Sequence, residues 1–284
     1  MFKEIFWFLL IVNGIVFGQL PSTAIIKFKI VKGDKYTISE PKHLSKRKGY
    51  NNQPSFSKSE KQIIFVSDSS GNQTDIYSLN IKSGKWKQLT KTEESEYSPQ
   101  YHEDGITCVR VLKDSSQVLQ TYNAKANEFL SDRYINIDSI GYYEFLNGDT
   151  LLYYKLTEPH TLRMKDFSNG NEIVICKQPV RSFKKINRHS FVYAVSDSLQ
   201  TMYFVFETVT KLSELIGRSE FRGEDFIYHN QLGLLVAHGT KIFSLKTENN
   251  WKLLFDLNEF GVRHISRFLI DKKISSLIIV DKID

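Results

Sequence analysis

Short runs of apolar residues, rich in β-branched and aromatic side chains, recur along the chain beyond residue 25. The clearest runs lie at 63–66, 151–154, 191–193, 232–236 and 277–280. At 75–81 apolar and polar residues alternate, which places Tyr77, Leu79 and Ile81 on one face of a strand. The best candidate for a helix, 211–216, is too short to change the class. The pattern therefore predicts an all-β protein.

Polar turn residues precede the apolar runs at a regular interval, with successive spacings of 45, 43, 40, 43 and 41 residues. These turn residues are Ser59, Asp104, Asn147, Asn187, Asn230 and Asp271. Six units with a period of about 42 residues are typical of a β-propeller with four-stranded antiparallel blades. The sixth unit is short, and the strand pair at 25–31 and 36–39 has no partners of its own. We therefore predict a six-bladed propeller in which 22–43 pair with 259–284 as the closing blade.

The first two units carry motifs that resemble the TolB-type propeller repeat. The first unit contains Asn52-Gln53-Pro54-Ser55-Phe56-Ser57, 63–72, Asp75-Ile76-Tyr77-Ser78-Leu79 and Ser83-Gly84-Lys85. The second unit keeps Ser98-Pro99-Gln100-Tyr101 and Asp104-Gly105. The resemblance implies a propeller scaffold without the N-terminal α/β domain of TolB, and a protein-binding role in the cell envelope. Similar blades precede a hydrolase domain in prolyl oligopeptidases, but the chain has no Gly-x-Ser-x-Gly motif, so we expect no peptidase activity of that kind.

The first 18 residues have the pattern of a secretory signal peptide. Lys3 precedes a 13-residue apolar stretch at 5–17, and the small residue Gly18 follows it. A membrane-spanning helix needs about 20 apolar residues, so an uncleaved anchor is the less favoured alternative. We predict a signal peptide at 1–18 and a single propeller domain at 19–284. The mature protein would be periplasmic or secreted, without a stable membrane span.

Composition and charge narrow the possible partners. Hydrophobic residues make up 41% of the chain, which is typical of a globular protein with a sizeable core. The net charge is +6, but the basic residues are scattered along the chain, so we expect no nucleic-acid partner. Cys108 and Cys176 both lie in apolar runs, which favours buried thiols over a metal or redox pair, with a disulfide as the alternative in an oxidising compartment.

The channel mouth is the expected binding site, at the start of the innermost strands. Counting eight residues back from each turn residue, and allowing the next residue, predicts the binding residues Asn51, Glu96, Tyr97, Arg222, Arg263 and His264. Arginine and tyrosine are frequent at the energetic centres of protein interfaces. We therefore predict an exported, envelope-associated module or scaffold that engages a protein or peptide partner at the channel mouth.

Two other functions stay open. A divalent-cation-dependent enzyme, lactonase-like or lyase-like, would need oxygen ligands such as Glu96, Asn51 and Asp138. Arg222 and Arg263 in the same ring would repel a cation, and the seven histidines form no pair with the spacing of zinc ligands. We therefore expect no catalytic residues, no metal site and no cofactor. A sensor for a small ligand or a glycan is the other alternative.

Overall fold

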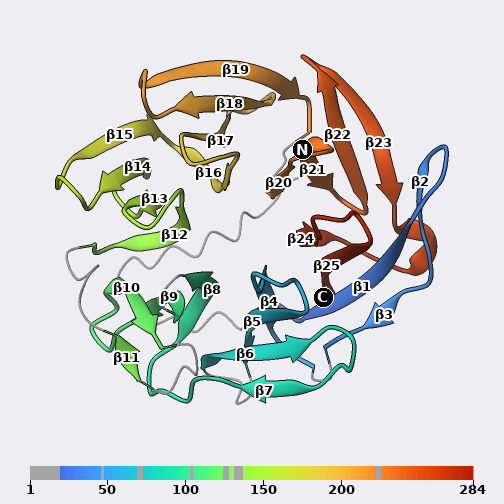
Figure 1. Cartoon of the computed structure of the whole chain (residues 1–284), viewed down its shortest axis with the longest axis horizontal. Coiled ribbons are helices and arrows are strands. Elements are labelled where there is room, and N and C mark those ends of the chain that lie inside the picture. The colour runs from blue at the N-terminus through green and yellow to red at the C-terminus, as the bar shows by residue number, and fades with distance from the viewer. Residues whose placement is uncertain are drawn as a thin grey trace, which may run out of the picture.

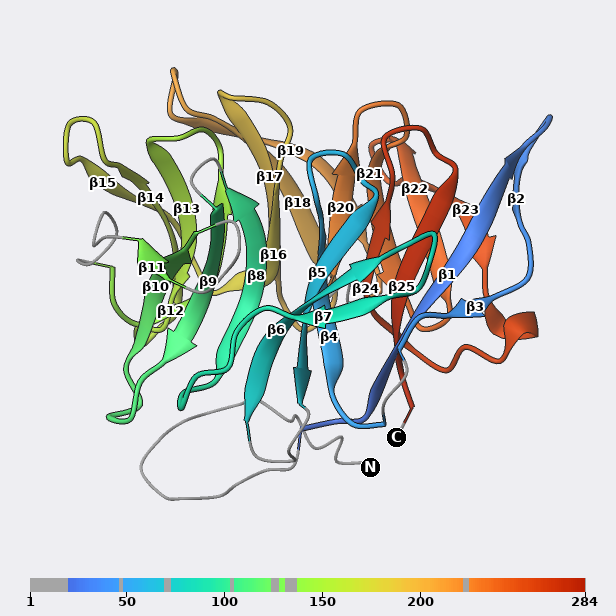
Figure 2. The same cartoon turned by 60° about the horizontal axis from the view of Figure 1, so that its bottom comes forward.

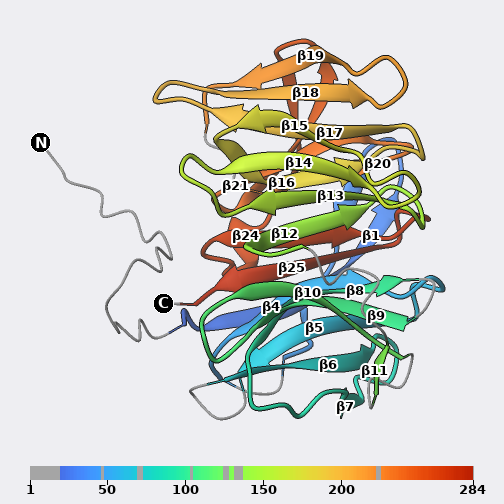
Figure 3. The same ribbon diagram turned by 90° about the vertical axis from the view of Figure 1, so that its left-hand side faces the viewer.

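Antiparallel β-strands form nearly all of the regular structure. The computed structural model describes residues 20–45, 48–68, 73–102, 105–123, 128–130, 137–221 and 225–283. Their strands form six antiparallel sheets, which stand as blades around a central channel (Figure 1). The strands run across the thickness of this ring (Figure 3). Among the described residues the only helix is the single-turn 3-10 helix η1 (Asn258–Phe260). The predicted all-β, six-bladed propeller is confirmed.

The predicted signal peptide at 1–18 lies outside the described residues. Within the described ranges, no helix has the length and apolar character that crossing a membrane requires.

Five blades are built from four consecutive strands each, with the first strand innermost (Figure 1). Blade 1 contains β4 (Asn51–Phe56), β5 (Gln62–Asp68), β6 (Thr74–Asn80) and β7 (Trp86–Gln88). Blade 2 contains β8 (Glu96–His102), β9 (Gly105–Val111), β10 (Gln117–Tyr122) and β11 (Phe129–Leu130). Blade 3 contains β12 (Ile140–Phe145), β13 (Thr150–Lys155), β14 (Thr161–Asp166) and β15 (Glu172–Lys177).

Blades 4 and 5 follow the same plan. Blade 4 contains β16 (Pro179–Lys185), β17 (Ser190–Ser196), β18 (Thr201–Glu207) and β19 (Leu212–Ser219). Blade 5 contains β20 (Phe226–His229), β21 (Gly233–His238), β22 (Lys241–Thr247) and β23 (Asn250–Asp256). The segment 211–216, the best sequence candidate for a helix, instead contributes to β19 and pairs with β18.

The closing blade joins the two ends of the described chain. From the C-terminal side come β24 (Ile265–Ile270) and β25 (Ser276–Lys282), and from the N-terminal side comes β1 (Thr23–Lys32). The short strands β2 (Tyr36–Ile38) and β3 (Lys42–His43) pair with β1 on its outer side. The strands β1 and β25 are antiparallel neighbours (Figure 2). The predicted closure by N- and C-terminal strands is therefore confirmed.

The predicted turn residues mark the turns between the first and second strands of the blades. Five of the six lie in such a turn, and Asp104 lies outside the described residues. The regular spacing of polar turn residues in the sequence therefore corresponds to the repeat of the blades.

A register shift interrupts five of the six inner strands. The shifts lie near 52–55 in β4, 97–100 in β8, 140–142 in β12, 179–183 in β16 and 265–267 in β24. In β4 and β8 they coincide with Pro54 and Pro99, which follow Gln53 (φ 54°) and Ser98 (φ 51°). A bulge leaves a residue without a ladder partner, so the missing proline N–H is tolerated there. Because a bulge also re-aims the chain, side chains before and after it face different surroundings.

Aromatic side chains fill the space between neighbouring blades. In blade 1, Trp86 packs edge-on against Phe65, and its Nε1 donates to the carbonyl of Leu44, which follows the closing blade's β3 (3.0 Å). In blade 5, Trp251 Nε1 donates to the carbonyl of Arg218 in blade 4 (2.6 Å). Both tryptophans therefore link one blade to the blade before it.

Candidate functional site

The central channel contains a cavity of about 460 Å³. It is lined by residues of the inner strands of all six blades and by Asp225, which lies just before β20. This volume falls within the range of about 300–1,000 Å³ that is usual for ligand pockets. In each blade, one lining residue lies three positions before the polar turn residue that follows the inner strand. These six are Phe56, Tyr101, Glu144, Lys184, Ile227 and Phe268.

The cavity lining begins where the inner strands change register. The first lining residues are Gln53 in β4, Ser98 in β8 and Tyr142 in β12, followed by Arg181 in β16 and Arg267 in β24. Each of them lies within a register shift or at its end. Residues before the shift, such as Asn51 and Tyr97, pack among neighbouring blades, and those after it line the cavity.

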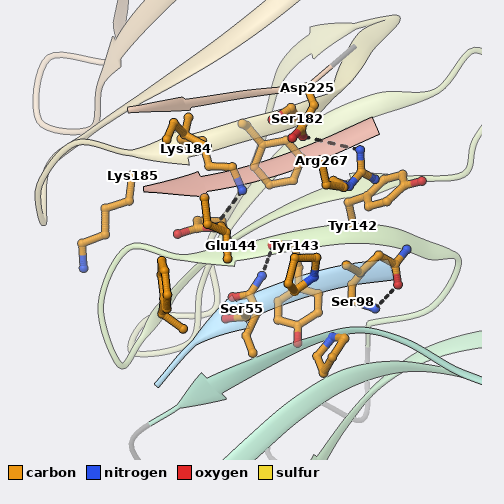
Figure 4. A pocket seen from close by; sticks show the side chains of 18 of the residues that line it. Ser55, Ser98, Tyr142, Tyr143, Glu144, Ser182, Lys184, Lys185, Asp225 and Arg267 are labelled. Carbon is orange, nitrogen blue, oxygen red and sulfur yellow. Dashed lines mark hydrogen bonds and ion pairs between the residues drawn. The ribbon is translucent and has the colours of Figure 1, made fainter. Parts of the chain in front are cut away.

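A buried ion pair lies on the channel wall between blade 5 and the closing blade. The Arg267 Nη1 atom lies 3.4 Å from the Asp225 Oδ1 atom, and Asp225 Oδ2 accepts the backbone N–H of Phe268 (3.2 Å). The Arg267 guanidinium also lies over the Tyr142 ring, 5.6 Å from its centre (Figure 4). Burial opposes the charge on Arg267, but the attraction of Asp225 and Tyr142 outweighs it and raises the pKa of Arg267.

Blade 4 contributes the other basic side chains of the cavity. The ammonium of Lys184 points towards the carboxylate of Glu144 but lies 4.0 Å from it, too far for a hydrogen bond (Figure 4). The side chain of Lys185 is exposed and makes no hydrogen bond or ion pair with another described residue. Arg181 donates from Nη2 to the carbonyl of Ser266 at 3.5 Å. Burial raises the pKa of the Glu144 carboxyl, and the nearby lysines oppose this shift.

Hydrogen bonds between blades hold the walls of the cavity in place. The Gln53 side chain accepts the backbone N–H of Ser98 (2.7 Å), and Gln100 Nε2 donates to the carbonyl of Tyr143 (2.7 Å). Each bond joins the inner strand of one blade to the inner strand of the next. The cavity is therefore preformed by the scaffold, and a ligand would bind without ordering its walls.

Two of the predicted site residues are buried between blades. The Asn51 side chain donates to the carbonyl of Thr23 in the closing blade (3.1 Å) and accepts from the Ser67 hydroxyl (2.9 Å). The Glu96 carboxylate accepts from the hydroxyls of Thr90, Thr92 and Tyr122. Both residues are completely shielded from solvent. They begin β4 and β8, and their polar groups tie each strand to its surroundings instead of lining the cavity.

The remaining predicted residues also lie away from the lining. Tyr97 packs against the apolar cluster between blades 2 and 3. Arg263 and His264 precede β24, are exposed, and donate their backbone N–H groups to Asp281 (both 2.9 Å). Arg222 lies outside the described residues. The structure thus brings none of the five described residues into the cavity.

The oxygen ligands considered for a cation do not form a common site. Asn51 and Glu96 make their hydrogen bonds in different blades. Asp138 is exposed and pairs with Lys155 (2.9 Å). Within the described residues no group of three or more histidine, cysteine, aspartate or glutamate side chains could hold a metal ion. The two carboxylates that line the cavity, Glu144 and Asp225, each face a basic side chain.

We expect the substitution Glu96→Gln to change how stability depends on pH. Burial raises the pKa of Glu96, and the hydrogen bonds from Thr90 and Tyr122 oppose this shift only in part. The folded protein therefore keeps the proton at a higher pH than the unfolded chain does. Stability is highest below the ordinary glutamate pKa and falls as the pH rises towards the raised value. Because glutamine does not titrate, the variant gains stability relative to the wild type over this interval.

Urea unfolding between about pH 4 and about pH 8 measures this trend. The matched control is Glu93→Gln, since the hydrogen bond and charge of Lys113 lower the pKa of the exposed Glu93. The control should lose stability relative to the wild type as the pH rises, which is the opposite sign. A pH-independent difference for Glu96→Gln would contradict the burial of an ionisable Glu96.

Comparisons with known proteins identify the fold. No protein-family model matches the sequence, and no curated protein does. Among solved structures, a putative TolB from Agrobacterium tumefaciens is similar with a TM-score of 0.67 and 10% identity, over 93% of this chain and 99% of that one. TolB from Acinetobacter baumannii gives a TM-score of 0.51 and 14% identity over 68% of this chain. The match spans only 51% of that TolB's length.

A gluconolactonase from Xanthomonas campestris is also similar, with a TM-score of 0.62 and 10% identity, over 92% of this chain and 96% of the enzyme. At these identities the likeness establishes a TolB-like propeller fold. TolB proteins and a gluconolactonase thus share the same architecture, so function has to be argued from the side chains of the cavity.

Proposed function

We propose that this protein is a binding module that receives a segment of a protein or peptide partner in its central channel. The observation that carries the proposal is the preformed cavity of about 460 Å³, whose walls combine aromatic rings with basic side chains. Aromatic residues and arginine are enriched where protein partners bind tightly. The TolB-like fold agrees with this role, and the N-terminal sequence pattern supports an exported, envelope-associated location.

A lactonase-like, divalent-cation-dependent enzyme is the second candidate, because a gluconolactonase has a similar fold. The charges of the cavity oppose it. Four basic side chains, Arg181, Lys184, Lys185 and Arg267, face two carboxylates, Glu144 and Asp225. This excess of positive charge repels a divalent cation. A rise in melting temperature with calcium that a chelator reverses would favour the enzyme over the binding module.

Filling the channel tests the binding module. Ser55 lines the cavity from β4 (Figure 4), so Ser55→Trp should obstruct it. Peptides selected from a random phage-displayed library on the wild-type protein should bind this variant at least about tenfold more weakly, which corresponds to about 1.4 kcal/mol. The control is Ser59→Trp in the exposed turn after β4. Thermal unfolding establishes that both variants fold. Equal binding to all three proteins would overturn the proposal.

A further inference from the structure

Among the basic side chains of the cavity, that of Arg267 is already neutralised, whereas two lysines of blade 4 lack a close anionic partner. Arg267 has a carboxylate partner, Asp225, at 3.4 Å. The ammonium of Lys184 has only the distant Glu144, and the ammonium of Lys185 makes no ion pair or hydrogen bond with a described residue. Both lysines come from the end of β16, next to each other in sequence and on the wall of the cavity. Blade 4 therefore presents two cations that a ligand can reach.

Apolar and aromatic side chains line the cavity beside these lysines. In the ring of residues three positions before the turns, Lys184 and Glu144 are the only charged members, and the others are Phe56, Tyr101, Ile227 and Phe268. Phe145 also lines this part of the cavity. A ligand that enters here meets cations on the side of blade 4 and the partly exposed rings of Phe56, Tyr101 and Phe145.

We infer that the segment bound in the channel is an acidic peptide, in which carboxylates contact Lys184 and Lys185 while an adjacent apolar side chain packs against Phe56 and Tyr101. This inference rests on the proposed function and adds the chemistry of the partner. The binding is charge-assisted, since a carboxylate accepts hydrogen bonds from ammonium groups that lack a close anionic partner. Glu144 limits the affinity, because it competes for Lys184 and repels the incoming carboxylate.

Two amidated, fluorescein-labelled peptides test the inference by fluorescence anisotropy. The first alternates glutamate with phenylalanine, and the second has glutamine in place of every glutamate. We expect the glutamate peptide to bind the full-length protein about tenfold more tightly, with an advantage that shrinks as salt is added. The double substitution Lys184→Ala/Lys185→Ala should remove this advantage. The control is Lys246→Ala/Lys252→Ala, two exposed lysines of blade 5 outside the cavity, which should keep it.

A third variant separates recognition of charge from simple loss of structure. Glu144→Gln should tighten binding of the glutamate peptide by a few-fold and leave the glutamine peptide unchanged, an increase that damage to the fold cannot produce. A glutamine peptide with a free C-terminal carboxylate identifies the source of the recognised group. If it binds as tightly as the glutamate peptide, the terminal carboxylate suffices, and if it does not, the side chains are required.

The outcomes separate the carboxylate inference from the proposed function. Equal binding of the glutamate and glutamine peptides, with both lost in Ser55→Trp, would overturn the carboxylate inference and leave the channel as a peptide site. Binding of both peptides that Ser55→Trp does not weaken would overturn the proposed function as well. No binding of either peptide to the folded wild type, or an unchanged advantage in Lys184→Ala/Lys185→Ala, also overturns the carboxylate inference.

Discussion

The substitution Phe28→Ala is expected to lower the free energy of unfolding by about 3–5 kcal/mol. Phe28 lies in β1 and is fully buried. It pairs in register with Leu277 of β25, and its ring packs edge-on against Phe260 at 5.3 Å. Removal of this ring leaves a cavity where the N-terminal strand joins the C-terminal strands. Urea unfolding followed by tryptophan fluorescence measures the loss.

The neighbouring substitution Lys29→Ala provides a matched control, because Lys29 lies in the same strand with its side chain exposed. It should change stability only slightly. If Phe28→Ala and Lys29→Ala had equal effects, β1 would not be packed in the ring in solution, and the closing blade would be wrong. If the ring closes as described, Phe28→Ala destabilises the whole propeller and not only β1, since the closing blade removes two exposed sheet edges.

The fold could be predicted because its signals are local and repeated. Each blade needs a polar turn between its first two strands, and Asn147, Asn187 and Asp271 accept backbone N–H groups within such turns. The same requirement recurs in every blade, which gives the sequence its period. Closure by the chain ends could be predicted by counting strands. The sixth unit is too short for four strands, and the two N-terminal strands, which belong to no other unit, complete it.

The cavity was harder to locate because its position depends on the bulges. Eight residues before the turn residues of blades 1 and 2 lie Asn51 and Glu96, at the start of β4 and β8. A polar residue there looked suited to a channel rim. The structure instead uses these side chains to bond neighbouring parts of the scaffold.

A count of three residues back from the turns finds Glu144 and Lys184, but nothing in a single sequence marks that offset. The prolines Pro54, Pro99 and Pro179 were the one available signal of irregular inner strands, and they occur in only three blades. Without the register shifts, strand periodicity alone could not show which side chains face the channel and which face a neighbouring blade.

The second large effect is expected from Asp225→Ala, which should destabilise the protein by about 3 kcal/mol because it leaves the Arg267 guanidinium buried without its carboxylate. The exposed fractions of the two side chains are only 16% for Arg267 and 8% for Asp225. The control is Lys241→Ala, which breaks the Lys241–Asp256 pair with the same N–O distance of 3.4 Å but with side chains that are 47% and 39% exposed. Chemical denaturation should show a much smaller change for this control.

The double substitution Asp225→Leu/Arg267→Met should recover most of the stability lost in Asp225→Ala, because apolar side chains of similar size need no partner. An effect of Asp225→Ala no larger than that of Lys241→Ala would mean that water in the channel screens the pair. Arg267 would then be as available to a ligand as Lys184 and Lys185. The size of the effect of Asp225→Ala therefore shows whether Arg267 holds two blades together or can bind a carboxylate as Lys184 and Lys185 can.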